Sequence, residues 1–143
     1  YQRALLEYGI PYDKNVVIEG RYTFESGEQA ADRLLSRGCP MDAVFAFNDM
    51  MAIGAMTRMN ARGIGIPTDL SVVGYDDIFV DQFLGVPLTT VRQPTEQLGR
   101  AAARKIITNE IGSHGKFGRI VFKPELIERQ TVINRISENG KEQ

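Results

Sequence analysis

Residues 41–77 read MDAVFAFNDMMAIGAMTRMNARGIGIPTDLSVVGYDD, and this stretch decides the fold. Residues 43–47 form a short apolar run of strand length, and residues 48–62 follow with apolar side chains at helical spacing. A break containing glycine and proline, at residues 63–69, precedes a second apolar run at residues 70–75. A strand, a helix and a strand in so few residues predict a βαβ unit, whose two strands are parallel.

The rest of the chain continues this alternation. Further helices are predicted at residues 1–8, 24–37 and 94–111, and one or two helical turns at 78–84. Further strands are predicted at residues 16–19, 89–91 and 119–123, and a last extended run at 126–132. Gly38 follows the second helix as a C-terminal cap. The sequence therefore predicts an α/β fold with a parallel sheet flanked by helices.

The composition excludes some classes of function but does not identify one. The chain has 143 residues, 43% of them hydrophobic and 24% charged, which fits about one soluble domain. A net charge of −1 gives no support for nucleic-acid binding by this chain. Cys39 is the only cysteine, so no disulfide closes within the chain, and no signal peptide or membrane span is visible. Because the sequence starts at Tyr1 in a helical pattern, we interpret it as the end of a longer protein.

Polar side chains follow the predicted strands where each strand ends. In open parallel sheets, ligands bind just beyond these carboxyl ends. Carboxylates and amides pair with neighbouring hydroxyl groups, and an aromatic ring covers the C–H face of a sugar. The pattern therefore favours a sugar-like ligand over a phosphate. The four predicted corners are Gly20-Arg21-Tyr22, Asn48-Asp49, Tyr75-Asp76-Asp77 and Arg92-Gln93.

Each corner also has a purely structural interpretation, which the sequence leaves open. These interpretations are helix capping for Asn48 or Asp49 and for Gln93, turn formation for Asp76 and Asp77, and packing of Tyr22 in a loop. His114 is predicted to be a loop residue with no nucleophile near it. We therefore expect no catalytic residue, no metal site and no cofactor, and we do not expect an enzyme.

The helix after Asn48 is apolar on more than one side. Ala52, Met56 and Met59 share the face that is expected to meet the core, whereas Met50 and Ile53 point elsewhere. Such a helix is either buried on both sides or meets a partner. We favour the partner, and Met50 and Ile53 are candidate contacts in a homodimer.

Four ordered motifs carry a family resemblance. Their residues are FNDMMAIGA at 47–55, LSVVGYDD at 70–77, PLTTVRQP at 87–94 and PELIER at 124–129. The chain thus resembles the LacI/GalR family of bacterial repressors over nearly its whole length. The resemblance implies a periplasmic-binding-protein-like (type I) fold of two lobes with the ligand cleft between them.

The resemblance also implies roles for individual residues. Asn48 and Asp76 match effector contacts, and Tyr22 stands where an aromatic residue stacks on the ligand. The dimer interface would combine Met50 and Ile53 with the region that follows the second strand. In that region the candidate contacts are Phe83 and Leu84.

The lobes implied by the resemblance divide the chain as follows: residues 1–92 in the C-terminal lobe, 93–123 crossing into the N-terminal lobe, 124–135 returning, and 136–143 as a polar tail. The expected function is ligand sensing in a cytoplasmic LacI-type regulator. A sugar or nucleoside effector would control DNA binding by a headpiece upstream of this sequence, and no membrane is involved. The alternative is the sugar-binding component of a transport system.

Overall fold

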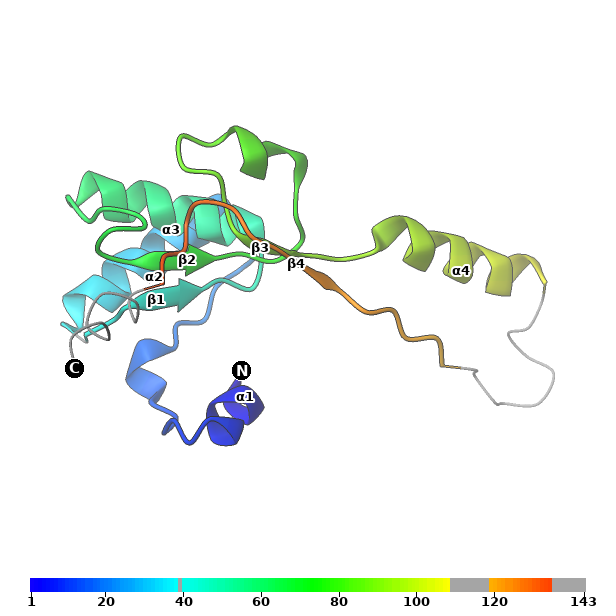
Figure 1. Cartoon of the computed structure of the whole chain (residues 1–143), viewed down its shortest axis with the longest axis horizontal. Coiled ribbons are helices and arrows are strands. Elements are labelled where there is room, and N and C mark those ends of the chain that lie inside the picture. The colour runs from blue at the N-terminus through cyan, green and yellow to red at the C-terminus, as the bar shows by residue number, and fades with distance from the viewer. Residues whose placement is uncertain (39, 109–118, 135–143) are drawn as a thin grey trace, which may run out of the picture.

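The computed structural model describes residues 1–38, 40–108 and 119–134. Its elements follow the predicted alternation closely (Figure 1). In chain order they are α1 (Gln2–Glu7), the 3-10 helix η1 (Lys14–Val16), α2 (Phe24–Ser36), β1 (Ala43–Phe45), α3 (Asp49–Ala61), β2 (Ser71–Val73), the 3-10 helix η2 (Phe79–Phe83), β3 (Thr90–Arg92), α4 (Thr95–Ile107) and β4 (Glu125–Ile127).

The predicted βαβ unit is present. Strands β1 and β2 are parallel, with Val44 opposite Val72, and α3 connects them. A parallel bridge between Val73 and Thr89 then places the start of β3 on the other side of β2. The α/β class and the parallel pairing are therefore confirmed.

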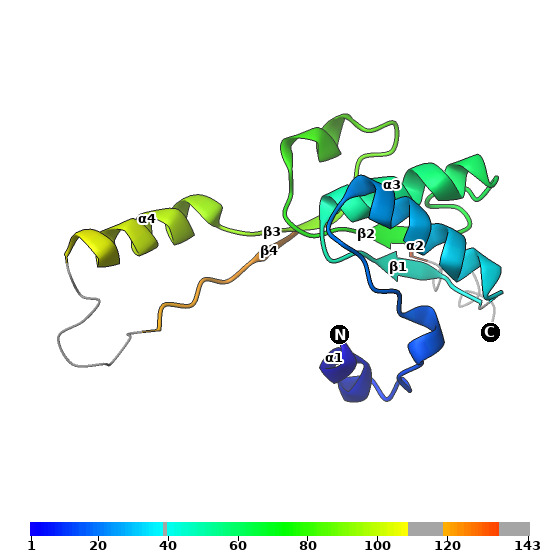
Figure 2. The same cartoon turned by 180° about the vertical axis from the view of Figure 1, so that it is seen from behind.

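Two glycines allow α2 and α3 to pack closely. A Cβ atom on Gly27 would lie 2.2 Å from the carbonyl oxygen of Met51, and one on Gly54 would lie 2.0 Å from that of Phe24. Any side chain at either position would push the helices apart. Both helices lie on the same side of the β1–β2 sheet (Figure 2).

The hydrophobic core fills the space between these helices and the sheet. Its fully buried members include Met59, Val72 and Leu88, from α3, β2 and the segment before β3. Met56 and Met59 face this core as predicted, while Ile53 packs at its margin. The helical spacing in the sequence therefore identified the core face of α3 correctly.

Three predicted elements differ from the structure. Residues 16–19 form no strand: Val17 is extended, with φ −110° and ψ 124°, but no described strand lies beside it to complete a hydrogen-bonded ladder. Residues 119–123 likewise form no strand. Strand β4 pairs with β3 in the antiparallel sense, and of the extended run predicted at 126–132 only residues 126 and 127 belong to it.

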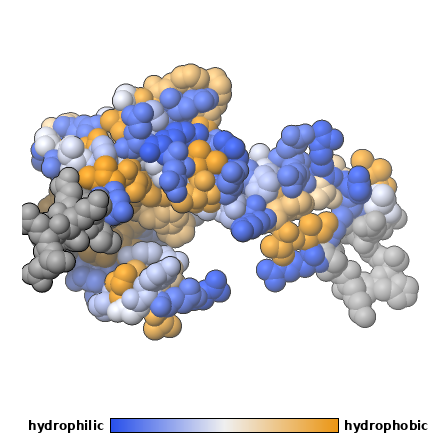
Figure 3. Space-filling view, in the orientation of Figure 1, coloured by the Kyte–Doolittle hydropathy of each residue, from blue (hydrophilic) through white to orange (hydrophobic). Residues whose placement is uncertain are grey.

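Helix α4 stands away from the rest of the molecule. It contains no buried residue, and the paired strands β3 and β4 connect it to the body (Figure 1). Hydrophobic side chains are visible on the surface of this projection (Figure 3). Leu98 and Ile106 on α4 are exposed, and so are Ile120 and Val121 in the segment that leads back to β4. An apolar surface of this kind requires a covering partner.

Several predictions fall on residues outside the described ranges. They concern Cys39, the loop with His114, the last residues of the predicted 94–111 helix and the tail at 136–143. Within the described residues, no helix is both long and apolar enough to cross a membrane.

Candidate functional site

Asn48 has two roles at the start of α3. Its Oδ1 atom accepts a hydrogen bond from the Met51 backbone N–H at 2.9 Å, which caps the helix. Its Nδ2 atom donates to the carbonyl oxygen of Tyr22 at 3.0 Å. The capping interpretation is therefore correct, and the same side chain joins two of the predicted corners.

Tyr22 is not a packed loop aromatic. Its side chain is among the exposed large apolar groups, with 67% of the residue accessible, and its φ of 62° lies in the left-handed region. That conformation is uncommon for a bulky residue and turns the chain sharply just before α2. The exposed ring is therefore available to a ligand.

Asp76 occupies a strained turn after β2. The φ angle of Asp76 is 124°, a backbone conformation that residues other than glycine rarely adopt. Asp77 follows with a φ angle of 59°. The Asp76 backbone N–H donates to the Val91 carbonyl oxygen at 2.9 Å. Gln93 Nε2 donates to Asp76 Oδ1 at 2.7 Å. The turn therefore presents a carboxylate that is oriented by the neighbouring strand.

Gln93 differs from its sequence-based interpretation. The N-terminal cap position of α4 is Pro94, and no side chain caps the helix there. The amide of Gln93 binds Asp76 instead, because β3 lies beside the turn after β2. Gln93 is thus part of the site edge.

Asp49 holds the Asn48 and Asp76 corners together. Its buried carboxylate accepts hydrogen bonds from Thr90 Oγ1 at 2.6 Å and from the Ile78 N–H at 3.0 Å. Gly74 makes room for this group, since a Cβ there would lie 2.1 Å from Asp49 Oδ1. The start of α3 is therefore tied to both β3 and the turn that contains Asp76.

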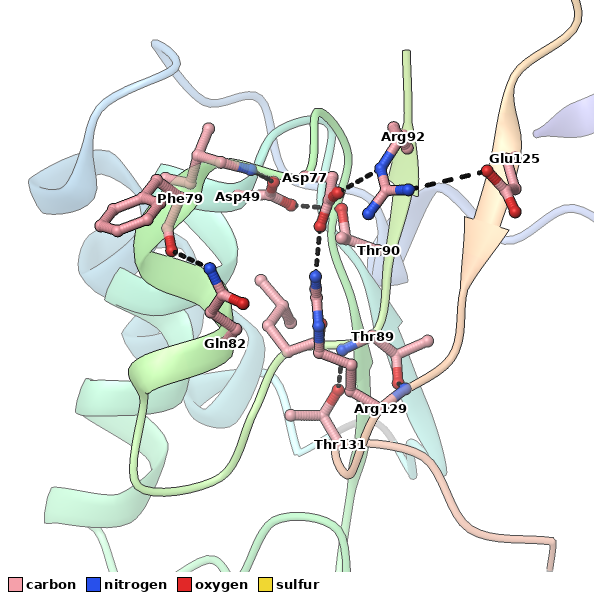
Figure 4. A network of polar contacts seen from close by, with 12 residues as sticks. Asp49, Asp77, Phe79, Gln82, Thr89, Thr90, Arg92, Glu125, Arg129 and Thr131 are labelled. Carbon is pink, nitrogen blue, oxygen red and sulfur yellow. Dashed lines mark hydrogen bonds and ion pairs between the residues drawn. The ribbon is translucent and has the colours of Figure 1, made fainter. Parts of the chain in front are cut away.

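Asp77 is the centre of a charged network (Figure 4). Its side chain is 8% exposed and accepts hydrogen bonds from Arg129 Nη2 and Arg92 Nε. Burial alone would raise the pKa of Asp77, but the hydrogen bonds and charges of Arg129 and Arg92 outweigh burial and hold that pKa below its ordinary value. Arg92 also reaches Glu125 on β4 at 3.8 Å.

The segment after β4 is anchored beside β2 and the start of β3. Arg129 Nη1 donates to the Leu88 carbonyl oxygen at 2.7 Å. Thr131 Oγ1 donates to the Val72 carbonyl oxygen at 2.6 Å and accepts from the Thr89 N–H at 2.9 Å (Figure 4). The network therefore fixes the two strands that lead to and from the α4 projection.

The edge carries hydrogen-bonding groups suited to hydroxyl groups. It offers the carboxylate of Asp76, the amides of Asn48 and Gln93, and the ring of Tyr22.

Within the described residues, no group of histidine, cysteine, aspartate and glutamate side chains is placed to hold a metal ion. A separate hollow of about 280 Å³ lies between residues 16–18 and β1, and its lining is mainly apolar. This hollow does not include Asn48 or Asp76.

Sequence reasoning missed several residues of this region. Thr90, Thr131 and Arg129 were not singled out, because each acts on residues more than 40 positions away. The PLTTVRQP and PELIER motifs contain Thr90 and Arg129, so the motifs marked the right segments without giving their contacts.

Residues 1–132 match the model of the periplasmic binding protein-like domain, and the chain belongs to this family. The resemblance to LacI-type regulators is also confirmed by its relatives. The transcriptional repressor PurR of Vibrio atlanticus is 41% identical over 133 residues, which cover 92% of this chain and 40% of the relative. The transcriptional regulator DegA of Bacillus subtilis is 37% identical over 131 residues, covering 92% and 39% respectively.

Solved structures agree with these relatives. A complex of the transcriptional regulator CelR with cellobiose superimposes with a TM-score of 0.84 and 39% identity, covering 92% of this chain and 40% of that one. The chain thus spans less than half the length of these relatives, and it corresponds to their effector-binding portion.

Proposed function

We propose that this chain is the ligand-sensing part of a cytoplasmic LacI-type transcription regulator, and that its effector is a small sugar or nucleoside. The proposal rests on the edge where Asp76, fixed by Gln93, lies in one corner and Asn48, bonded to Tyr22, in the next. CelR, which shares this fold, binds cellobiose in its solved complex. No enzymatic step is part of the proposal.

In this proposal the effector lies on the edge with its hydroxyl groups toward Asp76 and Asn48 and one ring face against Tyr22. The described part of this edge is open, so the opposite wall of the site belongs to a second lobe. Helix α4 and residues 119–123 lie in that lobe, since they stand away from the body and expose apolar side chains. Residues 1–92 and 124–134 belong to the C-terminal lobe.

The regulator acts as a homodimer whose DNA-binding headpiece lies outside this sequence. Its dimer surface includes Met50, which is 41% exposed at the start of α3, and Phe83, which is 65% exposed at the end of η2. Ile53 and Leu84 pack against the core beneath this surface and support it. Phe79 extends the surface, because its ring lies 5.0 Å from that of Phe83.

The direct test is calorimetric titration of the intact regulator with a panel of monosaccharides, disaccharides including cellobiose, and nucleosides. We expect saturable binding of at least one member, with one site per chain. The same ligand must then change the affinity of the regulator for operator DNA, by the ~1–3 kcal/mol that is typical of coupled sites. Absence of binding across the panel would contradict the effector class, and binding without any effect on DNA affinity would contradict the regulatory role.

A further inference from the structure

Asp81 is a buried carboxyl group that takes no part in the proposed effector site. It lies in η2 between Phe79 and Phe83, which are both exposed, yet Asp81 itself is fully buried. Among the described residues, no donor group lies within hydrogen-bond distance of either of its carboxyl oxygens. An ionised carboxylate in such a place lacks the donors that would replace water, so it is strongly disfavoured.

The backbone of Asp81 is well fixed, which makes its buried position a stable feature. Its N–H donates to the Ile78 carbonyl oxygen at 3.1 Å, and its own carbonyl oxygen accepts from the Leu88 N–H at 3.1 Å. These bonds hold η2 between the turn after β2 and the segment before β3. Moving the Asp81 side chain into water therefore requires η2 to open from both sides.

Asp81 interacts with a second carboxyl group, that of Asp49 at the start of α3. Ile78 bonds both residues: its N–H donates to Asp49 Oδ2 at 3.0 Å, and its carbonyl oxygen accepts from the Asp81 N–H at 3.1 Å. Burial, followed by the hydrogen bond and the charge of Asp49, raises the pKa of Asp81 to about 8. The charge of Asp77 acts in the same direction. Arg129 opposes these effects, but its guanidinium group is engaged with Asp77 and with the Leu88 carbonyl oxygen.

The two carboxyl groups can form a hydrogen bond only if one of them keeps its proton. Asp49 already accepts from Thr90 Oγ1 and from the Ile78 N–H, as a carboxylate does. Asp81 receives no such bonds. We propose that Asp81 is the protonated member of the pair and donates its O–H to Asp49, so that a single proton fastens η2 to the start of α3.

This proton connects two surfaces. Asp49 adjoins Asn48 on the site edge, and η2 carries the exposed rings of Phe79 and Phe83 on the outside of the molecule. Loss of the proton places two negative charges together in a buried space, which favours opening of η2. The position of the Phe79–Phe83 surface therefore depends on pH.

The direction of the pH dependence follows from the two states of Asp81. In the closed state the pKa of Asp81 is about 8, and in water it has the ordinary value of 3.8. The closed state thus holds an extra proton between these values, and opening becomes easier as pH rises through this window. A fully linked proton gives up to a ~tenfold rise in the opening equilibrium per pH unit, which levels off above the folded pKa.

Hydrogen exchange at the Leu88 amide of the intact protein measures this opening, because that amide is bonded to Asp81. After correction for intrinsic exchange, we expect the opening equilibrium of the wild type to rise several-fold per unit between pH 5.5 and 7.5. Asp81→Asn keeps a neutral donor of the same size, so its opening should be independent of pH. Glu128→Gln removes an exposed carboxyl group and should behave as the wild type.

Equal pH slopes in the wild type and in Asp81→Asn would overturn the proposal. Should the variant fail to fold, the wild type itself decides the matter. The ¹³C signal of the Asp81 carboxyl group should titrate near pH 8, and a titration near the ordinary value of 3.8 would show that no proton is shared.

Discussion

Thr90 Oγ1 donates a 2.6 Å hydrogen bond to Asp49 Oδ1 across 41 positions of sequence, and both side chains are fully buried. This contact joins the start of α3 to the start of β3. It gives the buried Oδ1 atom of Asp49 its donor, while Oδ2 accepts from the Ile78 N–H. The packing of the site edge therefore depends on one hydroxyl group.

Replacing Thr90 by valine keeps the shape of the side chain and removes this donor. We expect the free energy of unfolding to fall by ~1–3 kcal/mol, because Asp49 is left with an unsatisfied buried oxygen. Urea denaturation followed by circular dichroism measures the change. Thr57→Val is the matched control, since the Thr57 hydroxyl is exposed on α3 and binds only a helix carbonyl. If both variants lose equal stability, the Asp49 bond contributes nothing particular.

The lowered pKa of Asp77 predicts that the stability of the protein falls in acid. This pKa is lowered below the ordinary value of 3.8, so the contribution of Asp77 to stability is fully present above that pH and is lost as pH falls through the folded pKa. We expect the wild type to lose stability more steeply than Asp77→Asn as pH falls below about 4. Thermal unfolding midpoints recorded across this range give the comparison. Parallel curves would show that the arginine contacts do not favour the ionised form of Asp77.

Asp76 provides the test of the effector edge. Once a ligand of the intact regulator is known, Asp76→Ala should weaken its binding by ~1–3 kcal/mol, the scale of a hydrogen bond to a charged group. Gln93→Ala should weaken it by less, since it removes only the group that orients Asp76. Asp69→Ala is the control, because Asp69 precedes β2 at its opposite end. Calorimetry that finds unchanged affinity for Asp76→Ala would exclude this residue from the site.

The proposed dimer surface is tested by adding charge to it. Met50→Glu combined with Phe83→Glu would place four like charges near the two-fold axis of an isologous contact, and we expect dissociation into monomers. Sedimentation velocity on the intact protein measures the oligomeric state. Leu6→Glu, an equally drastic change of an exposed residue on α1, should leave a dimer. A double variant that remains dimeric would place the interface elsewhere.

Sequence alone was sufficient to predict the order of the main elements, and it pointed to the edge at which we propose that a ligand binds. Periodicity in residues 41–77 was sufficient for β1, α3 and β2, because their hydrophobic side chains repeat at the spacing of the structures they form. The sequence also identified Asn48 and Asp76 as candidate ligand contacts, because each is a polar residue directly after an apolar run of strand length. The capping role of Asn48 was open in the sequence and is settled by its bond to Met51.

Only the tertiary structure decided which distant residues meet. Residues 16–19 have the composition of a strand, but strand formation needs a neighbouring ladder, which the described chain does not supply. Gln93 binds Asp76 instead of capping α4, and Asp81 is buried beside Asp49 although its own helix is largely exposed. Local spacing cannot predict such contacts, because they depend on how separate segments are brought together by packing.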